Sequence, residues 1–221
     1  MSTFPDLLAR RLRTDPAQPF VTYYDDATGE RTELSVTTYA NWVSKTANLL
    51  ADELMLDPGD DLRVDLPPHW LGTVFLGAAL SCGVGFADEA EVAVVGPDGI
   101  DDALSRGTGT VLACALLPFA TRFREPLPAG VLDHGTLWAG QSDVFSPVEP
   151  TVLATPAADD RRVITDLDPL ADGGALLVGL LAGTGSLVLV ANADESARNS
   201  GWPAHSQSER ATAAVRAEGL I

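Results

Sequence analysis

Two glycines in the last quarter of the chain have the spacing of a phosphate-binding loop. Gly183 and Gly185 lie in the stretch LLVGLLAGTGSLVLV, with Thr184 and Ser186 beside them. In nucleotide-binding proteins such glycines let backbone N–H groups approach a phosphate, provided that the loop leads from a strand into the N-terminus of a helix. The chemistry of this stretch therefore depends on the order of the elements around it.

That order is the reverse of the one that a phosphate loop requires. The run ALLVGLLA before the glycines is typical of a helix, and SLVLV after them is typical of a strand. Gly183 then occupies a helix C-cap position, at the negative end of the helix dipole, where phosphate is disfavoured. SCGVGFAD repeats the order helix, glycine, strand, and GTGTVL also leads into a strand. We interpret all three stretches as turns.

Three aspartates form the best polar cluster in the sequence. Asp166, Asp168 and Asp172 follow the predicted strand in RRVITDLD. Open α/β sheets bind ligands at the carboxyl ends of their parallel strands, so these aspartates are candidate pocket residues for a ligand or cofactor. The alternative is a solvated loop in which one aspartate caps the next helix. Their negative charge would repel ATP unless a cation intervened.

The histidines are scattered along the chain. His69, His134 and His205 lack metal-ligand spacing, and a cap or surface role suits His69 better than catalysis because it stands at the start of a helix. Asp133 adjoins His134, but neighbours in sequence do not form a catalytic pair by spacing alone. The motifs G-x-S-x-G and H-E-x-x-H are absent from the sequence. We therefore expect no catalytic residue and no metal site.

The composition argues against several classes of function. A net charge of −17 disfavours binding to nucleic acid and to anionic membranes, which requires basic patches. The start MSTFPDLLAR does not resemble a signal peptide, and no uninterrupted apolar run reaches the roughly 18 residues of a transmembrane helix. Cys82 and Cys114 stand in apolar surroundings without a CxxC partner, which predicts buried, reduced thiols in a cytoplasmic protein.

Helices and strands alternate along the chain. In the first third, the patterns predict a helix in STFPDLLARRLRTDP capped by Ser2 or Thr3, a hairpin over 20–36, and a long helix capped by Thr37 or Thr38. They then predict a strand in DLRVDL, a helix that starts at the prolines of PPHWLGTVFLGAALSCG, strands in VGFA, EVAVVG and TVLACALL, and a short helix near IDDALSR. In the last third, they predict a strand in RRVITDLD, a helix from about Pro169, and a strand in GSLVLV. Residues 117–160 are predicted to be irregular. Ser206 and Glu209 form a capping-box pattern for a last helix.

This order predicts an α/β fold over residues 1–221, with a mostly parallel sheet covered by helices on both faces. Tyr39, Trp42, Trp70 and Phe75 recur at helical spacing. We interpret them as core residues rather than as a ligand box.

The first 90 or so residues resemble the N-terminal region of adenylate-forming enzymes, the family of acyl-CoA synthetases, luciferases and nonribosomal-peptide adenylation domains. The matching positions are Leu34, Ser35 and Tyr39 in an LTYxEL-like start, Pro58, Gly59 and Asp60 in a GD turn, and Leu66 and Pro67 at a strand end. ALSCGVGF stands where the family has lkaGavyvP, and ITDLDPLADGGALLVGLLAGTGSLVLV resembles lPlfHigGl…aLlaGatvVl. The resemblance covers about two thirds of the chain. It implies the N-terminal half of an acyl-CoA synthetase large domain, and a short actinobacterial AMP-binding-like subfamily is the most similar.

The departures from that family bear on activity. The family makes an acyl-adenylate from ATP and a carboxylate with a phosphate loop, roughly TSGTTGxPK, where this chain reads FSPVEPTVLATPAADDRR. The YGxTE-like motif and the small C-terminal domain with its catalytic lysine are not found, and the family's pocket histidine falls near Ala171. Lys45, the single lysine, lies in mid-helix, where it cannot replace either family lysine. Adenylation needs donors that stabilise the triphosphate charge.

These observations favour a truncated relative that has lost its ATP machinery and serves as a binding or partner module without a cofactor. A second copy or a protein partner is expected to cover apolar surface left exposed. The first alternative is an AMP-binding acyl-activating enzyme, an ATP-dependent ligase that uses ATP or AMP with Mg at a remodelled or partner-completed site. The second is a hydrolase or transferase on an unrelated α/β fold, which would need a compact nucleophile–base pair.

Overall fold

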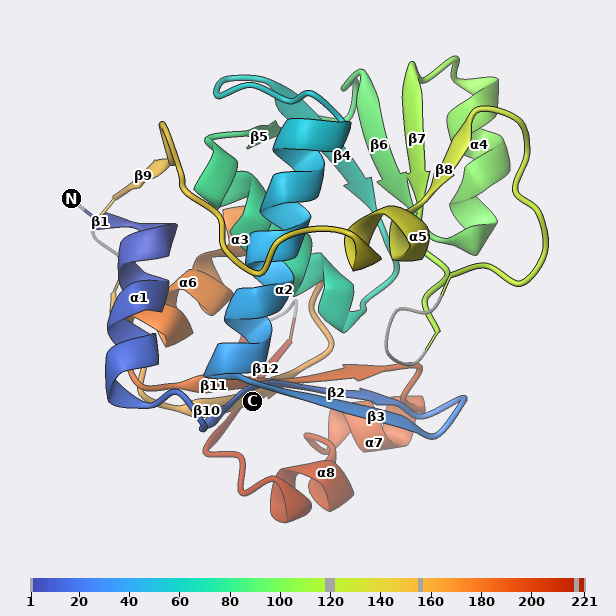
Figure 1. The fold of residues 1–221 in the computed structure, drawn as a ribbon. Coiled ribbons are helices and arrows are strands. Elements are labelled where there is room, and N and C mark those ends of the chain that lie inside the picture. Colours follow the sequence, from blue (N-terminus) through green and yellow to red (C-terminus); the bar gives the residue numbers. More distant parts are fainter. Residues whose placement is uncertain (1, 118–121, 155–156, 217–218, 221) are drawn as a thin grey trace.

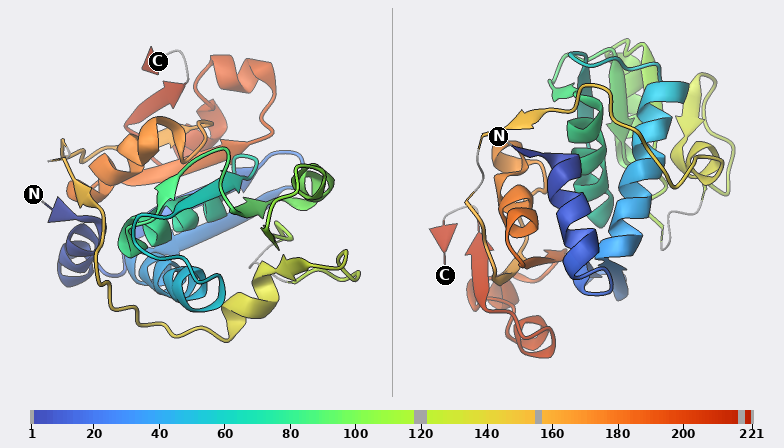
Figure 2. Two further views of the ribbon diagram at one scale, coloured as in Figure 1. Left: turned by 90° about the horizontal axis from the view of Figure 1, so that it is seen from above. Right: turned by 60° about the vertical axis from the view of Figure 1, so that its left-hand side comes forward.

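Two sheets share a layer of helices in the computed structural model of the chain, which describes residues 2–117, 122–154, 157–216 and 219–220. The helices of this layer are α1 (Phe4–Thr14), α2 (Val36–Asn48), α3 (Trp70–Cys82) and α6 (Ala175–Ala182). Figure 1 shows them standing on one face of the larger sheet, and the right-hand view of Figure 2 shows them lying alongside one another. The predicted α/β class is confirmed.

The larger sheet combines strands from both halves of the chain. Its order is β13 (Gly219–Leu220), β12 (Ala213–Arg216), β10 (Arg162–Thr165), β11 (Ser186–Ala191), β2 (Pro19–Asp25) and β3 (Glu30–Ser35). The inner strands are parallel, and β3 and β13 pair antiparallel at the edges. Helices α7 (Glu195–Asn199) and α8 (Pro203–Ser208) lie on the other face, where Trp202 packs on Ile164 and Val188.

The smaller sheet is parallel throughout its described strands. Its order is β5 (Gly85–Phe86), β4 (Asp61–Asp65), β6 (Val92–Val95), β7 (Thr110–Ala113) and β8 (Val131–Asp133). Helix α4 (Ile100–Ser105) packs on one face, and α3 packs on the other. The remaining elements are α5 (His134–Ala139) and the antiparallel pair of β1 (Ser2–Thr3) with β9 (Val152–Leu153).

Helix α3 lies at the centre of the molecule. All of its residues are buried, because it faces both sheets and the neighbouring helices at once. Tyr39, Trp42, Trp70 and Phe75 are buried in this shared core, as predicted. Cys82 and Cys114 are buried free thiols, also as predicted. Burial raises the pKa of the Cys82 thiol to about 12, so it stays protonated at neutral pH.

Two predicted helix starts are wrong, and one is confirmed. Thr3 caps α1 in a capping box with Asp6. Helix α2 is capped by Ser35, not by Thr37 or Thr38, because β3 runs directly into the helix without a loop. Helix α3 begins at Trp70, after the two prolines, because His69 is its N-cap.

The structure also corrects three predictions in the second half. Helix α6 begins at Ala175 rather than near Pro169, because Asp172 and Gly173 adopt positive φ angles of 50° and 63° and interrupt the helix. The described part of residues 117–160 is largely irregular, yet it contains β8, α5 and β9, and residues 118–121 and 155–156 of that prediction lie outside the described residues. The Ser206 and Glu209 pattern does not open a last helix: α8 ends at Ser208, and the chain continues into strand β12.

Tertiary contacts explain why Glu209 does not act in a capping box. Its carboxylate accepts hydrogen bonds from Tyr24, Arg31 and Arg162, which belong to β2, β3 and β10. Burial alone would raise the pKa of Glu209, but these hydrogen bonds outweigh it and lower the pKa from 4.5 to about 2. The network fastens the end of α8 to the larger sheet.

We expect this network to make stability depend on pH. Because the pKa of Glu209 is lower in the folded state, its contribution is complete above about pH 5 and is lost as the pH falls toward 2. Glu209→Gln should lower the free energy of unfolding at pH 7 by about 2 kcal/mol, with a smaller loss on acidification than in the wild type. Urea unfolding at pH 7, 4 and 3 measures both effects, with the exposed Glu89→Gln as control. If the wild type and Glu209→Gln lost equal amounts of stability on acidification, this prediction would be contradicted.

The surface of the described residues exposes few large apolar side chains. Those that are exposed are Met55, Leu104, Val144, Val148 and Val152. Three of the five lie between residues 144 and 152, on the segment that crosses in front of α2 in Figure 1. A partner that covers them stays a prediction. In the part of the chain that the structure describes, none of the helices has the length and hydropathy needed to cross a membrane.

Candidate functional site

A cavity of about 430 Å³ lies where the carboxyl ends of strands from both sheets meet. The larger sheet contributes the ends of β2, β10 and β11, and the smaller sheet contributes the segments after β4 and β7. The lining residues are Tyr23, Asp25, Pro67, Pro68, His69, Leu116, Asp166, Val190, Ala191, Asn192 and Arg198. Open α/β sheets bind ligands at this edge, and we call this space the carboxyl-edge cavity.

His69 is the most buried polar residue of this cavity. It is 2% exposed, and its Nδ1 accepts a hydrogen bond from the Leu71 N–H at 3.2 Å. The proton of the neutral ring therefore resides on Nε2, which is buried without a hydrogen-bond partner among the described residues. Burial lowers the pKa of His69 to about 4, so the ring is neutral at pH 7. Nε2–H is thus an unpaired donor on a residue that lines the cavity.

Two polar pairs complete the lining. Asn192, with a positive φ of 56°, donates a hydrogen bond of 2.9 Å to Asp25, directly beside the paired strand ends of β2 and β11. Burial alone would raise the pKa of Asp25, but the hydrogen bonds from Asn192 and from the backbone of Ala27 hold it below its usual value. Asp166 forms an ion pair of 2.9 Å with Arg198 of α7. The cavity lining thus holds two carboxylates and one guanidinium.

The structure does not bring the three predicted aspartates into one site. Asp166 lines the 430 Å³ cavity, whereas Asp168 and Asp172 line a separate space of about 40 Å³ beside Leu176. Both are exposed, and Asp168 accepts the Leu170 N–H at 2.9 Å in a local turn. Helix α6 has Gly174 as its N-cap, so no aspartate caps it.

The glycine stretch is a packed turn, as predicted. Gly183 is the C-cap of α6, and a Cβ on Gly183 or Gly185 would overlap the backbone of Asp159. Arg11, which is 2% exposed, donates from Nη1 to the carbonyl oxygens of Leu180, Gly183 and Gly185 at 3.0, 3.0 and 3.2 Å. The loop thus presents acceptors to a cation, the opposite of a phosphate cradle.

Lys45 has a structural role. Its Nζ donates to the carbonyl oxygen of Gln141 at 2.6 Å, lies 3.6 Å from the Asp143 carboxylate and stands over the Trp138 ring at 5.0 Å. It fixes the segment after α5 to helix α2, and it does not line the carboxyl-edge cavity. That Lys45 does not replace a family lysine stays a prediction.

Sequence reasoning missed most of this cavity. Asp25, Asn192 and His69 each lie at or just beyond the carboxyl end of a parallel strand, a signal that was available in the strand pattern. Arg198 belongs to α7, a short helix that the patterns did not predict. In the described ranges, no group of three or more His, Cys, Asp or Glu side chains is arranged to hold a metal ion.

No family model matches the chain. A TIGR03089 family protein of Mycobacterium tuberculosis is 35% identical over 220 residues, an alignment that covers 85% of this chain and 89% of that protein. The chain belongs to the TIGR03089 family. The resemblance to an actinobacterial subfamily is thereby confirmed.

Solved structures show which fold this TIGR03089 family member has. An acyl-CoA synthetase of Brucella canis superposes with a TM-score of 0.78 at 16% identity, over 97% of this chain and 47% of that one. Acetoacetyl-CoA synthetase of Streptomyces lividans gives 0.72 at 18% identity, over 97% and 42%. MbtA of Mycobacterium smegmatis gives 0.68 at 14% identity, over 94% and 46%.

The chain therefore has the fold of one part of an acyl-CoA synthetase, and an unrelated α/β fold is excluded. It spans less than half the length of each of these three solved chains. At these identities the likeness concerns the fold.

Proposed function

We propose that this protein binds a small ligand in the carboxyl-edge cavity and does not by itself form acyl-adenylates. This proposal rests mainly on the charge of the cavity lining. Its lining holds the carboxylates of Asp25 and Asp166, a neutral His69, and one guanidinium, Arg198, which is already paired.

Adenylation places developing negative charge on the phosphates of ATP, and catalysts of that reaction stabilise it with preorganised cations and N–H donors. The net charge of the cavity lining is negative, so a triphosphate entering it is repelled. The single lysine is bound to Gln141 and Asp143 on another part of the surface. The glycine turn between α6 and β11 is filled by Arg11 and the backbone of Asp159.

The same lining suits an uncharged or cationic ligand. Leu116, Val190 and the two prolines offer apolar walls, and the unpaired Nε2–H of His69 can donate to a carbonyl or hydroxyl oxygen. A buried donor without an acceptor is costly, so a ligand oxygen that pairs with it gains affinity. Neutral amides and cationic amines are the first ligand classes to test.

Two assays test the proposal. We expect no ATP–pyrophosphate exchange above background with a panel of carboxylic acids, in parallel with an active acyl-CoA synthetase as positive control. We also expect no rise in melting temperature with ATP–Mg, AMP or coenzyme A at millimolar concentration, because a ligand that binds the folded state must raise it. Neutral amides or amines should raise the melting temperature, and His69→Phe should reduce that response.

Saturable, Mg-dependent exchange would overturn the proposal. It would favour the alternative of an ATP-dependent acyl-activating enzyme whose site is remodelled or completed by a partner chain. The variant Asp25→Asn/Asp166→Asn tests the charge argument, because it removes two negative charges without changing the size of the lining. If charge excludes nucleotides, AMP should stabilise this variant more than it stabilises the wild type.

A further inference from the structure

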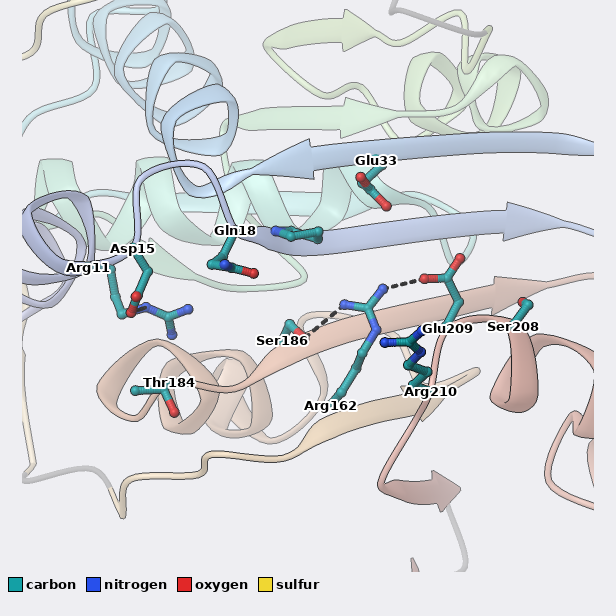
Figure 3. A pocket seen from close by; sticks show the side chains of 11 residues that line it. Arg11, Asp15, Gln18, Glu33, Arg162, Thr184, Ser186, Ser208, Glu209 and Arg210 are labelled. Atoms are coloured by element: carbon teal, nitrogen blue, oxygen red, sulfur yellow. Dashed lines mark hydrogen bonds and ion pairs between the residues drawn. The ribbon is translucent and has the colours of Figure 1, made fainter.

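A second cavity, of about 580 Å³, lies at the opposite, amino ends of the same parallel strands. The starts of β2, β10 and β11, the end of α1 and the segment after α8 form its walls. Its lining residues are Arg11, Asp15, Gln18, Pro19, Glu33, Arg162, Thr184, Ser186, Ser208, Glu209 and Arg210, and Figure 3 shows their side chains. Apart from Pro19, the lining is polar.

Two arginines reach into this cavity from neighbouring segments. Arg162, at the start of β10, donates hydrogen bonds to the hydroxyl oxygens of Ser186 and Thr22 at 2.9 and 3.0 Å. It also donates to the Glu209 carboxylate. Arg210 follows the end of α8 and adopts a positive φ of 52°. Figure 3 shows both guanidinium groups in the middle of the cavity, with Arg11 approaching from the side of α1.

The carboxylates of the cavity neutralise these arginines only in part. Glu209 accepts from Arg31, Arg162 and Tyr24, and Glu33 lies 2.6 Å from Arg31. Arg31 itself does not line the cavity, so these carboxylates are partly satisfied from outside it. Within the described ranges, Arg210 lies within ion-pair distance of no carboxylate.

The buried Arg11 lies in the wall of the same cavity. Its Nη1 serves three carbonyl oxygens, but its Nε is buried without a hydrogen-bond acceptor among the described residues, and the Asp15 carboxylate stays 3.9 Å away. A buried guanidinium N–H without an acceptor is uncommon in proteins. Three arginines thus line a cavity with three carboxylates, two of which also pair with Arg31, in a chain whose net charge is −17.

We propose that this amino-edge cavity binds a small, hydroxylated organic anion. Its carboxylate or phosphate group lies between Arg162 and Arg210, because guanidinium groups match both kinds of oxyanion in geometry and charge. Its hydroxyl groups face Glu33, Asp15 and the hydroxyl oxygens of Thr184 and Ser208. All of these can accept hydrogen bonds, because the two hydroxyls donate their own protons to Asp160 and to the His205 carbonyl oxygen. The volume exceeds that of an inorganic ion and suits a ligand with a polar body.

Calorimetric titration of the full chain at low ionic strength tests the proposal. Glucose 6-phosphate and gluconate present the two oxyanions on similar hydroxylated bodies, and glucose is the uncharged control. At least one anion should bind saturably, while glucose should not bind. Arg210→Gln should weaken that binding about tenfold or more, because one charge-assisted hydrogen bond is lost. Arg124→Gln, an exposed arginine outside the cavity, is the matched control and should bind as the wild type does.

Three results would overturn the proposal: no heat with either anion at millimolar concentration, equal binding of glucose, or unchanged affinity in Arg210→Gln. The two anions also identify which oxyanion the cavity takes. Arg210 is exposed and supports no described contact of the core, so the variant should keep the wild-type melting temperature. These outcomes are independent of nucleotide binding or adenylation at the carboxyl edge.

Discussion

Replacing Arg11 with methionine is expected to lower the free energy of unfolding by about 3–5 kcal/mol. Arg11 is 2% exposed, and its Nη1 is the donor for the carbonyl oxygens of Leu180, Gly183 and Gly185. Methionine fills similar space without a donor, so these carbonyl oxygens are left buried at the negative end of helix α6. The loss therefore combines several unsatisfied acceptors with the loss of a favourable dipole interaction.

Chemical unfolding followed by circular dichroism measures this effect. Arg13→Met is the control, because Arg13 lies in the last turn of the same helix but is exposed. It should change the free energy of unfolding by less than about 0.5 kcal/mol. If the two variants were equally stable, Arg11 would not be the cap of the α6 terminus that its geometry indicates.

Replacing Gly185 with alanine is expected to cost about 2–3 kcal/mol, without any nucleotide present. A Cβ at this position would overlap the backbone oxygens of Asp159 and Arg161 and the side chain of Leu180. Backbone atoms on either side belong to a paired strand and its approach, so they can move aside only by disrupting β10 and β11.

Gly140→Ala is the matched control. Gly140 ends α5 with a φ of −82°, and an added Cβ would meet only the Leu137 carbonyl oxygen, at 3.8 Å. Thermal unfolding of both variants should therefore show a large decrease in melting temperature for Gly185→Ala and little change for Gly140→Ala. A stable Gly185→Ala protein would contradict the interpretation of the GTG stretch as a packed turn.

The amino-acid sequence by itself determined the features that depend on neighbouring residues. Thr3 and Asp6 lie three positions apart, and their side chains alone can satisfy the first N–H groups of α1. The order of helix, glycine and strand around Gly183 predicted a turn because a helix C-terminus offers carbonyl oxygens, whatever the fold around it. Alternating elements and apolar spacing likewise predicted the α/β class and the buried aromatic residues Tyr39 and Trp70.

Other features required the tertiary structure, because their partners are distant in sequence. Glu209 has the spacing of a capping box, but two arginines and a tyrosine on three strands draw its carboxylate to the sheet, and β12 pairs with β10 where a helix was predicted. Local preference is worth little against such charged contacts and strand pairing.

The carboxyl-edge cavity is the clearest case. Asp25 and Asn192 meet only because β2 and β11 are neighbours in the larger sheet. Asp166 meets Arg198 only because α7 lies on the face of that sheet opposite the shared helix layer. Asp168 and Asp172 lie in the turns between β10 and α6 and line a separate space beside Leu176. Packing of the whole core sets the order of the strands and the path of the backbone, and these decide which polar side chains share a cavity. The spacing of residues along the chain decides only which polar side chains follow a strand.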